Sequence, residues 1–300
     1  MKIALLMSGG LGKFCYGSDN DKISNKWKDI VKNNNIDVFC VTDNNNFYDE
    51  SSDIQYFSEK NVLKEVINGN SWRYYKKNSN IVYDDAKKKI QIILQKYFST
   101  NLKKKLILDN DTFTIDKLVT NKYQKQFYDY TSGRSILSKY NVLCQFYKLK
   151  RCLELMKEYE TENNINYDII IRCRFDCIIE SLKDVNVIRN LNFKNTIYTT
   201  GSEFHIYDWY IIGNYEIMNK ICNYYNELGK NVVDNYKLFL YYDDNGKYIE
   251  YKKGYNIIKD KKYKIYHDVS DSSELGITYI LDLNNYKYKT SLEFKLDREY

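Results

Sequence analysis

The start of the chain alternates a buried strand, a polar helix and a second buried strand. Residues 2–7 ("KIALLM") form an apolar run that ends at a Ser-Gly-Gly turn, 20–34 suit a polar helix, and 36–43 ("IDVFCVTD") are apolar again. A strand, a helix and a strand in close succession predict a βαβ unit with parallel strands. We therefore expect an α/β fold with a Rossmann-like, mostly parallel sheet flanked by helices, and ligands at the carboxyl ends of its strands.

The spacing of apolar residues predicts the elements that follow. In the clearest helix, 138–162, apolar residues recur every three or four positions, at Val142, Leu143, Phe146, Leu149, Leu153 and Met156. The other expected elements are helices over 82–99 and 273–281, a helix capped by Asn214 and ended by Gly229, strands over 104–111, 195–200 and 208–213, and a hairpin around 243–246.

The chain shows neither an internal repeat nor a linker, so we expect one domain with an extension. The core would span 1–235, with a variable insertion region over 45–135. Residues 236–300 are rich in tyrosine and would form a small C-terminal extension packed on the core.

Charge and cysteine usage limit the class of protein. The net charge is +6, but basic and acidic residues are interleaved, which argues against nucleic-acid binding and suits a phosphorylated small substrate. The seven cysteines are scattered without a CxxC pair, as expected in a reducing compartment. Because no apolar run is long enough to span a bilayer, we expect a soluble, cytoplasmic protein without a transmembrane segment.

The segment "YDIIIRCRFD" (167–176) is an apolar strand interrupted by charges, although only seven of the 46 basic residues are arginine. Alternate side chains of a strand share a face. The two rows are Ile171, Cys173 and Phe175 on one face, and Arg172, Arg174 and Asp176 on the other. The charged row predicts an anion site, because a guanidinium can bind two phosphate oxygens at once, with Asp176 placed for a divalent cation or a ribose hydroxyl. The alternative is an internal salt bridge, for instance to Asp168 or Glu180.

Two other segments are candidates for ligand contact. "SGGLGK" (8–13) is not a P-loop, since Met7 and Phe14 replace its first Gly and its Ser/Thr, but a glycine-rich turn lets backbone N–H groups approach a ligand. The alternative is a plain tight turn. Asp109 and Asp111 follow an apolar run and are possible ligands of Mn²⁺ or Mg²⁺, or ordinary turn residues.

Four segments together resemble one protein family. "MKIALLMSG", "IDVFCVT", "YDIIIRCRFD" and "DWYIIGNYEIM" are similar to segments of GT-A-type glycosyltransferases from mimivirus-like giant viruses and bacterial polysaccharide loci. In that group the arginine strand stands in place of a DxD motif. This chain departs from the group's pattern, because Gly10 and Gly12 replace its Gln and Arg, with Lys13 adjacent, and its Trp after the second strand is missing.

The resemblance implies a GT-A-like fold and a transfer of sugar from a nucleoside-diphosphate donor to a hydroxyl of a glycan or glycoprotein. The donor site implied is Ser8, Gly9, Gly10, Lys13, Thr42, Asp43, Arg172, Arg174 and Asp176. Asp176 would also hold Mn²⁺ or Mg²⁺, with His267 as a possible further ligand, and Asp208 would orient or deprotonate the acceptor, with Glu203 as a rival.

Two other functions stay open. One is a sugar-phosphate nucleotidyltransferase, which would release pyrophosphate instead of a nucleoside diphosphate. The other is a degenerate, non-catalytic relative that serves as a binding or structural module, which the loss of Gln and Arg near the first strand favours.

Overall fold

The structure is a computed structural model of the chain. It describes residues 1–11, 14, 22–43, 47–49, 54–56, 83–108, 115–129, 136–201, 206–230, 236–242, 248–255, 263–267, 273–290 and 295–296.

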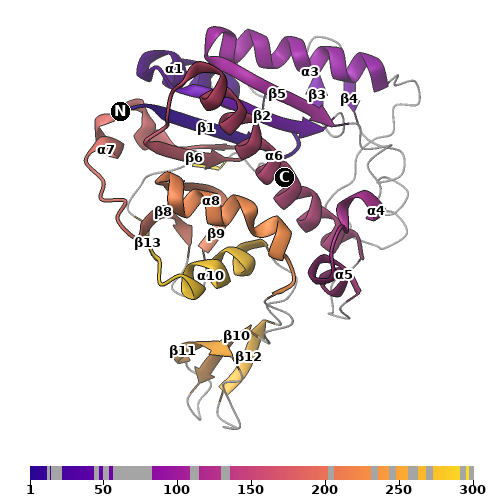
Figure 1. Cartoon of the computed structure of the whole chain (residues 1–300), viewed down its shortest axis with the longest axis vertical. Helices are drawn as coiled ribbons and strands as arrows, with labels where there is room; N and C mark the ends of the chain where they lie inside the picture. Colours follow the sequence, from indigo (N-terminus) through magenta and orange to yellow (C-terminus); the bar gives the residue numbers. More distant parts are fainter. Residues whose placement is uncertain are drawn as a thin grey trace.

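A seven-stranded sheet forms the centre of the molecule (Figure 1). Its strands are β1 (Ile3–Ser8), β2 (Asp37–Asp43), β5 (Leu102–Leu108), β6 (Ile169–Cys173), β8 (Thr196–Gly201), β9 (Ile206–Gly213) and β13 (Lys287–Lys289). Their order is β13-β8-β9-β6-β1-β2-β5. Neighbouring strands are parallel, except that β9 is antiparallel to both β6 and β8. The expected α/β class with a mostly parallel, Rossmann-like sheet is confirmed.

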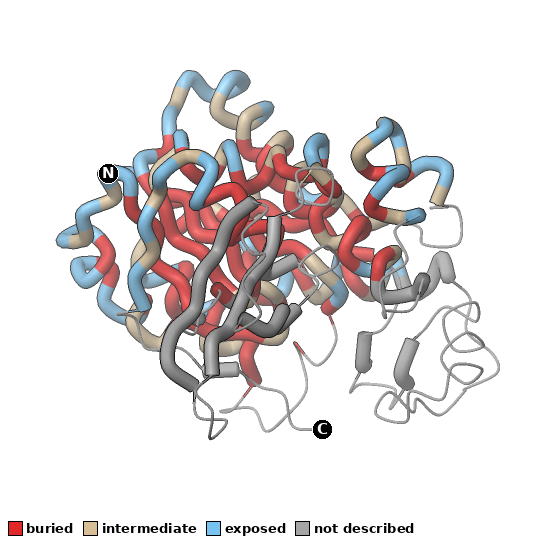
Figure 2. The backbone as a smooth tube through the Cα atoms, turned by 90° about the horizontal axis from the view of Figure 1, so that it is seen from below, coloured by how far each residue is buried: buried red, intermediate tan, exposed pale blue. Residues whose placement is uncertain are grey.

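Helices cover both faces of this sheet. The long ones are α1 (Ile23–Asn34), α3 (Tyr83–Phe98), α6 (Ile136–Asn163), α8 (Tyr215–Asn223) and α10 (Ser273–Leu283). Apolar residues of α6, α8 and α10 pack with Ala4 and Leu6 of β1, and those of α1 and α3 pack with Ile3, Leu5 and Met7. The two cores therefore lie on opposite sides of the sheet, and Figure 2 shows the buried backbone gathered in the interior.

Shorter elements complete the described chain. They are β3 (Phe47–Asp49), β4 (Ile54–Tyr56), η2 (Ser99–Asn101), α4 (Ile115–Leu118), α5 (Lys122–Asp129), β7 (Cys177–Ile178), η3 (Glu180–Lys183), α7 (Asn186–Arg189), η4 (Tyr224–Glu227) and β14 (Lys295–Leu296). The sequence analysis did not identify these elements, because each is too short to show an apolar period.

The expected helices and strands are present with shifted ends. The helix expected over 138–162 is α6, and Asn214 caps α8 by accepting a hydrogen bond from the Ile217 N–H at 3.0 Å. The expected end of this helix at Gly229 is wrong, since α8 ends at Asn223 and continues as η4. Gly229 has φ +96 beyond η4, where a Cβ would lie 2.3 Å from the Tyr123 carbonyl oxygen.

The C-terminal part contains a second sheet and three elements that contact the core, namely α10, β13 and β14. β10 (Tyr236–Tyr242), β11 (Tyr248–Tyr255) and β12 (Tyr263–His267) form an antiparallel sheet that extends from the rest at the bottom of Figure 1. The pairing of β10 with β11 confirms the hairpin across 243–246. β13 pairs with β8, and β14 with β7. The domain boundary at 235 stays a prediction.

No helix among the described residues is both long enough and apolar enough to cross a membrane.

One hydrogen bond fixes the segment that follows β6. Trp27 of α1 is fully buried, and its indole Nε1–H donates to the Cys177 carbonyl oxygen at 2.8 Å. Cys177 begins β7, directly after the Arg174–Asp176 turn, so this bond holds the turn against α1.

Replacing Trp27 by Phe removes this bond and leaves the Cys177 carbonyl buried without its donor. We expect Trp27→Phe to lower the free energy of unfolding by about 1–3 kcal/mol in urea denaturation. Ile30→Val is the control, because Ile30 lies on the same buried helix face without such a bond and should cost about 0.5–1.5 kcal/mol. A Trp27→Phe protein as stable as the wild type would contradict this role.

Candidate functional site at the carboxyl ends of the strands

The order of the strands reverses at β1. From β1 the chain continues to β2 and then β5 on one side, and it later returns to place β6 on the other side. Such a reversal opens a crevice at the carboxyl ends of the two strands, where α/β proteins bind ligands. The register pairs Met7 with Cys173, so Ser8 lies level with Arg174 at this edge.

The turn after β1 requires glycine. Gly9 has φ +130, a conformation that side chains rarely allow, and its N–H donates to the Val41 carbonyl oxygen at 3.2 Å. A Cβ on Gly9 would meet no atom within 4 Å, so the space beside it is open. Gly10 is exposed, and Lys13 lies outside the described residues. The backbone therefore leaves room for a ligand at the tip of β1.

The alternation predicted for the arginine segment is confirmed on one face. Ile171, Cys173 and Phe175 are all fully buried in the core beneath α1 and α3. The strand ends at Cys173, so Arg174 and Asp176 lie in the turn between β6 and β7.

Arg172 does not face an open cleft, which corrects the expectation for this residue. Its side chain is 1% exposed and points to the α6 side of the sheet, where its strand neighbours are Leu6 and Ile211. None of its three guanidinium nitrogens has a hydrogen-bond partner among the described residues. Burial lowers the pKa of Arg172, and attraction by Asp208 opposes that shift. A buried guanidinium without hydrogen bonds is costly to the fold and requires an explanation.

Arg174 joins two carboxylates. Its Nε and Nη2 donate to the two oxygens of Asp176 at 2.8 and 2.6 Å, and its Nη1 lies 3.7 Å from Asp208 Oδ1. Burial acts to lower the pKa of Arg174, but Asp176 and Asp208 raise it overall. The side chains of Arg174 and Asp176 are 27% and 23% exposed, whereas that of Asp208 is 5% exposed. The internal salt bridge considered from sequence exists, with these partners instead of Asp168 or Glu180.

Helix α6 adds two polar residues that the sequence analysis missed. Gln145 Nε2 donates to Asp208 Oδ2, and Lys148 forms a buried ion pair with Asp43 at the end of β2. Burial alone would lower the pKa of Lys148, but attraction by Asp43 raises it above the ordinary value. A signal was present, because Lys148 lies four residues from both Cys144 and Cys152, so the three share a buried helix face.

The remaining predicted residues divide into described and undescribed ones. Ser8 is 1% exposed, and its Oγ has no hydrogen-bond partner among the described residues. Thr42 is fully buried, and its hydroxyl donates to the Asp43 carbonyl oxygen at 3.5 Å. Asp109, Asp111 and Glu203 lie outside the described residues, and for His267 only the backbone, in β12, is described.

The described residues do not by themselves form a metal site. They contain no group of three or more His, Cys, Asp or Glu side chains that could hold an ion. Both oxygens of Asp176 accept hydrogen bonds from Arg174, so an ion there would share this carboxylate with the guanidinium.

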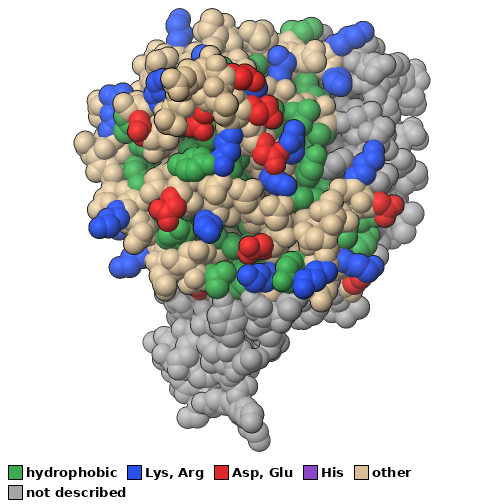
Figure 3. Space-filling model, in the orientation of Figure 1, with side chains coloured by type: hydrophobic (Ala, Val, Ile, Leu, Met, Phe, Trp, Pro, Cys, Tyr) green, Lys and Arg blue, Asp and Glu red, His purple; other side chains and the backbone are tan. Residues whose placement is uncertain are grey.

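The surface drawn in Figure 3 mixes charges of both signs, without the basic stripe typical of nucleic-acid binding.

The chain matches no protein-family model, and no curated protein is detectably similar to it.

Removing Lys148 would leave Asp43 buried without its cation. We expect Lys148→Met to lower the free energy of unfolding by about 3–5 kcal/mol, and Asp43→Asn/Lys148→Met to recover most of this. Lys150→Met is the control on the same helix, because its ion pair with Glu154 is partly exposed and should contribute less than about 1 kcal/mol.

The same pair makes a testable contribution to pH dependence. A lysine pKa that is raised in the folded state stabilises the fold below the unfolded value of about 10.4, and this is lost as the pH rises through the folded pKa. As the pH rises from about 10.4 towards the folded pKa of Lys148, the wild type should therefore lose stability more steeply than the double variant. Equal slopes would contradict the pairing of Asp43 with Lys148.

Proposed function

We propose that the chain is a glycosyltransferase that moves a sugar from a nucleoside-diphosphate donor to a hydroxyl of a glycan or glycoprotein. The observation that carries this proposal is the partly exposed guanidinium of Arg174, which directly follows β6 at the strand reversal where a phosphate-bearing ligand is expected. The guanidinium of Arg172, buried beneath α6 without a hydrogen-bond partner among the described residues, adds a positive charge behind it.

Other polar groups at this edge suit the same donor. Ser8 and Arg172 follow Ala4, Leu6 and Ile170 on the α6 side of the sheet, and the Ser8 hydroxyl also has no described partner. The open space beside Gly9 would admit a ligand to within reach of backbone N–H groups. The guanidinium of Arg174 is 27% exposed, so it can be reached from solvent.

The chemistry of transfer gives these groups roles. As the bond between the sugar and the diphosphate breaks, negative charge develops on the departing phosphate, and fixed arginine donors stabilise that charge. Asp208 is held by Gln145 and lies beside Arg174, so it stays oriented towards this charge cluster. Asp176 is the more exposed carboxylate and is the better placed of the two to meet an acceptor hydroxyl.

A bound divalent cation would supply further positive charge to the diphosphate. Because Asp176 is already bonded to Arg174 and the described residues form no complete metal site, we assign no step to an ion. We place the activity in the cytoplasm, or in a viral factory if the chain is viral. The six described cysteines are free, as suits a reducing compartment.

A non-catalytic sugar-nucleotide-binding module is the second candidate. One observation favours it: Arg174 is occupied by two carboxylates of the chain itself, as in a site that has become structural. Calorimetry against a panel of nucleotide sugars, with and without Mn²⁺, tests binding, and release of nucleoside diphosphate tests turnover. Binding without turnover on any acceptor supports the module, and absence of binding to every donor contradicts both functions.

Arg172→Met separates a ligand-binding arginine from a structural one. Replacing a buried ion by an apolar side chain of similar size is often neutral or stabilising by about 1–4 kcal/mol. We therefore expect Arg172→Met to unfold at an equal or higher urea concentration, while its affinity for a nucleoside diphosphate falls less than that of Arg174→Gln, because it loses a nearby positive charge but no hydrogen bond to phosphate. A destabilised variant that binds as tightly as the wild type would contradict the proposed role.

Arg174→Gln tests the second guanidinium. Hydrogen bonds to charged groups contribute about 1.5–3 kcal/mol, so we expect its affinity for a nucleoside diphosphate to fall about 10- to 100-fold in calorimetry. Arg189→Gln is the matched control, because it removes the same charge from an exposed position in α7. Equal affinities of the two variants would show that the effect is one of net charge.

A further inference from the structure

Helices α1 and α3 lie side by side on one face of the main sheet, at the top of Figure 1. The sequence of α1, "ISNKWKDIVKNN", contains three lysines and one aspartate. That of α3, "YDDAKKKIQIILQKYF", contains four lysines and two aspartates. Positive charge is therefore in excess in the helices of this face.

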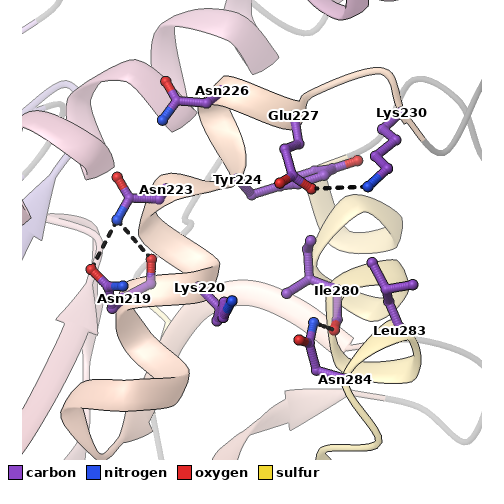
Figure 4. A pocket seen from close by; sticks show the side chains of 10 residues that line it. All are labelled: Asn219, Lys220, Asn223, Tyr224, Asn226, Glu227, Lys230, Ile280, Leu283 and Asn284. Atoms are coloured by element: carbon purple, nitrogen blue, oxygen red, sulfur yellow. Dashed lines mark hydrogen bonds and ion pairs between the residues drawn. The ribbon is translucent and has the colours of Figure 1, made fainter.

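The helices of the other face are balanced in charge. The sequences of α6, α8 and α10 together contain six basic and seven acidic residues. Some of the basic residues on this face are also paired, as Lys150 is with Glu154 at 3.7 Å. Figure 4 shows the surface between α8–η4 and α10, where Lys230 lies 3.6 Å from Glu227. The two faces of the sheet therefore differ in charge, and only the α1–α3 face is basic.

The outward side of α3 combines lysines with an apolar residue. Ile90 and Leu94 are buried against the sheet, whereas Lys88, Ile92 and Lys96 follow one another at four-residue spacing and are exposed. Ile92 is 66% exposed, more than any other large apolar side chain among the described residues. One turn of helix separates it from a lysine on either side.

Helix α1 extends the same surface. Lys28 and Lys32 are exposed one turn apart, with the exposed Asp29 between them in sequence. Neither of these lysines, nor Lys88 of α3, forms an ion pair with a described residue. Because both helices pack on one face of one sheet, their outward sides form a single surface. We call Lys28, Lys32, Lys88, Ile92 and Lys96 the lysine face.

The arrangement of these charges suits an extended anionic surface. A single phosphate is bound by cations that converge on it, usually with an arginine fork, but the lysine face spreads its ammonium groups over two helices. Clusters of lysine on a helix surface are typical of contact with the anionic phospholipids of a cytoplasmic leaflet. Long lysine stems let the ammonium groups reach lipid phosphates while a neighbouring apolar side chain enters the interface.

Ile92 favours a lipid surface over a nucleic acid. Both partners offer phosphate groups to the lysines, but the backbone of a nucleic acid would place charge and water against an aliphatic side chain at the centre of the contact. The boundary between headgroups and acyl chains instead gives Ile92 an apolar environment.

We propose that the lysine face docks the protein on a membrane surface rich in anionic phospholipid. The contact is peripheral: lysines bind the headgroups, and Ile92 enters the interface without any segment crossing the bilayer. Docking does not depend on the proposed function, because the lysine face lies on α1 and α3 and includes none of the residues of the strand-end site.

Co-sedimentation of the full-length chain with vesicles tests this docking. We expect binding to phosphatidylcholine vesicles that contain about one third phosphatidylserine, no binding to phosphatidylcholine alone, and weaker binding at high salt. Lys88→Gln/Lys96→Gln should weaken binding about 10- to 30-fold. Lys122→Gln/Lys125→Gln is the matched control, because it removes two exposed lysines from α5, which packs against α6 on the other face. It should bind nearly as the wild type does.

Ile92→Gln tests the apolar contact and keeps a good helix former on the surface of α3. It should weaken binding about three- to fivefold. Its matched control is Leu283→Gln, because Leu283 is 43% exposed on α10, as Figure 4 shows, and its loss should leave vesicle binding unchanged.

Three outcomes would overturn membrane docking. They are a failure to bind anionic vesicles, an equal loss in the two lysine double variants, and binding to duplex DNA as tight as to vesicles with no effect of Ile92→Gln. Nucleoside-diphosphate binding is measured on the same samples and should be equal in all these variants and the wild type. Vesicle binding without donor binding overturns only the proposed function, and the reverse result overturns only the docking.

Discussion

A strand that is buried on both faces can present polar groups to a ligand only at its ends. Every residue of β1 and of β6 is buried, because the cores formed with α6 and with α1 cover the two sides of the sheet. This constraint leaves the carboxyl ends of the strands, where the glycine turn follows β1 and the arginine turn follows β6, as the place for the candidate site. It also makes Arg172 exceptional, as a charged side chain inside a strand that is otherwise apolar and cysteine-containing.

Helix α6 supplies partners for two of the buried carboxylates at this edge. The helix provides Lys148 for Asp43 and Gln145 for Asp208, and it then leads directly into β6. The segment that carries the arginines and the helix that orients its surroundings are therefore consecutive in the chain. A buried ion pair contributes little net stability compared with apolar packing, but it fixes geometry, because breaking it is costly. The arrangement favours a rigid site over a maximally stable one.

The sequence predicted the fold class and most long elements, because a period of two or of three to four residues identifies strands and helices directly. It also predicted the buried row of Ile171, Cys173 and Phe175. It did not predict that Arg172 would be sealed beneath α6, since alternation gives the face of a residue but not what covers that face.

Lysines stand at both margins of the main sheet. The outermost strands are β5, with Lys103, Lys104 and Lys105, and the three-residue β13, with Lys287 and Lys289 exposed. A marginal strand with free backbone groups invites another chain to add to it, and short length and lysine side chains discourage such addition. The abundance of lysine in this protein thus has a local consequence: at both margins it disfavours the addition of a strand from another molecule.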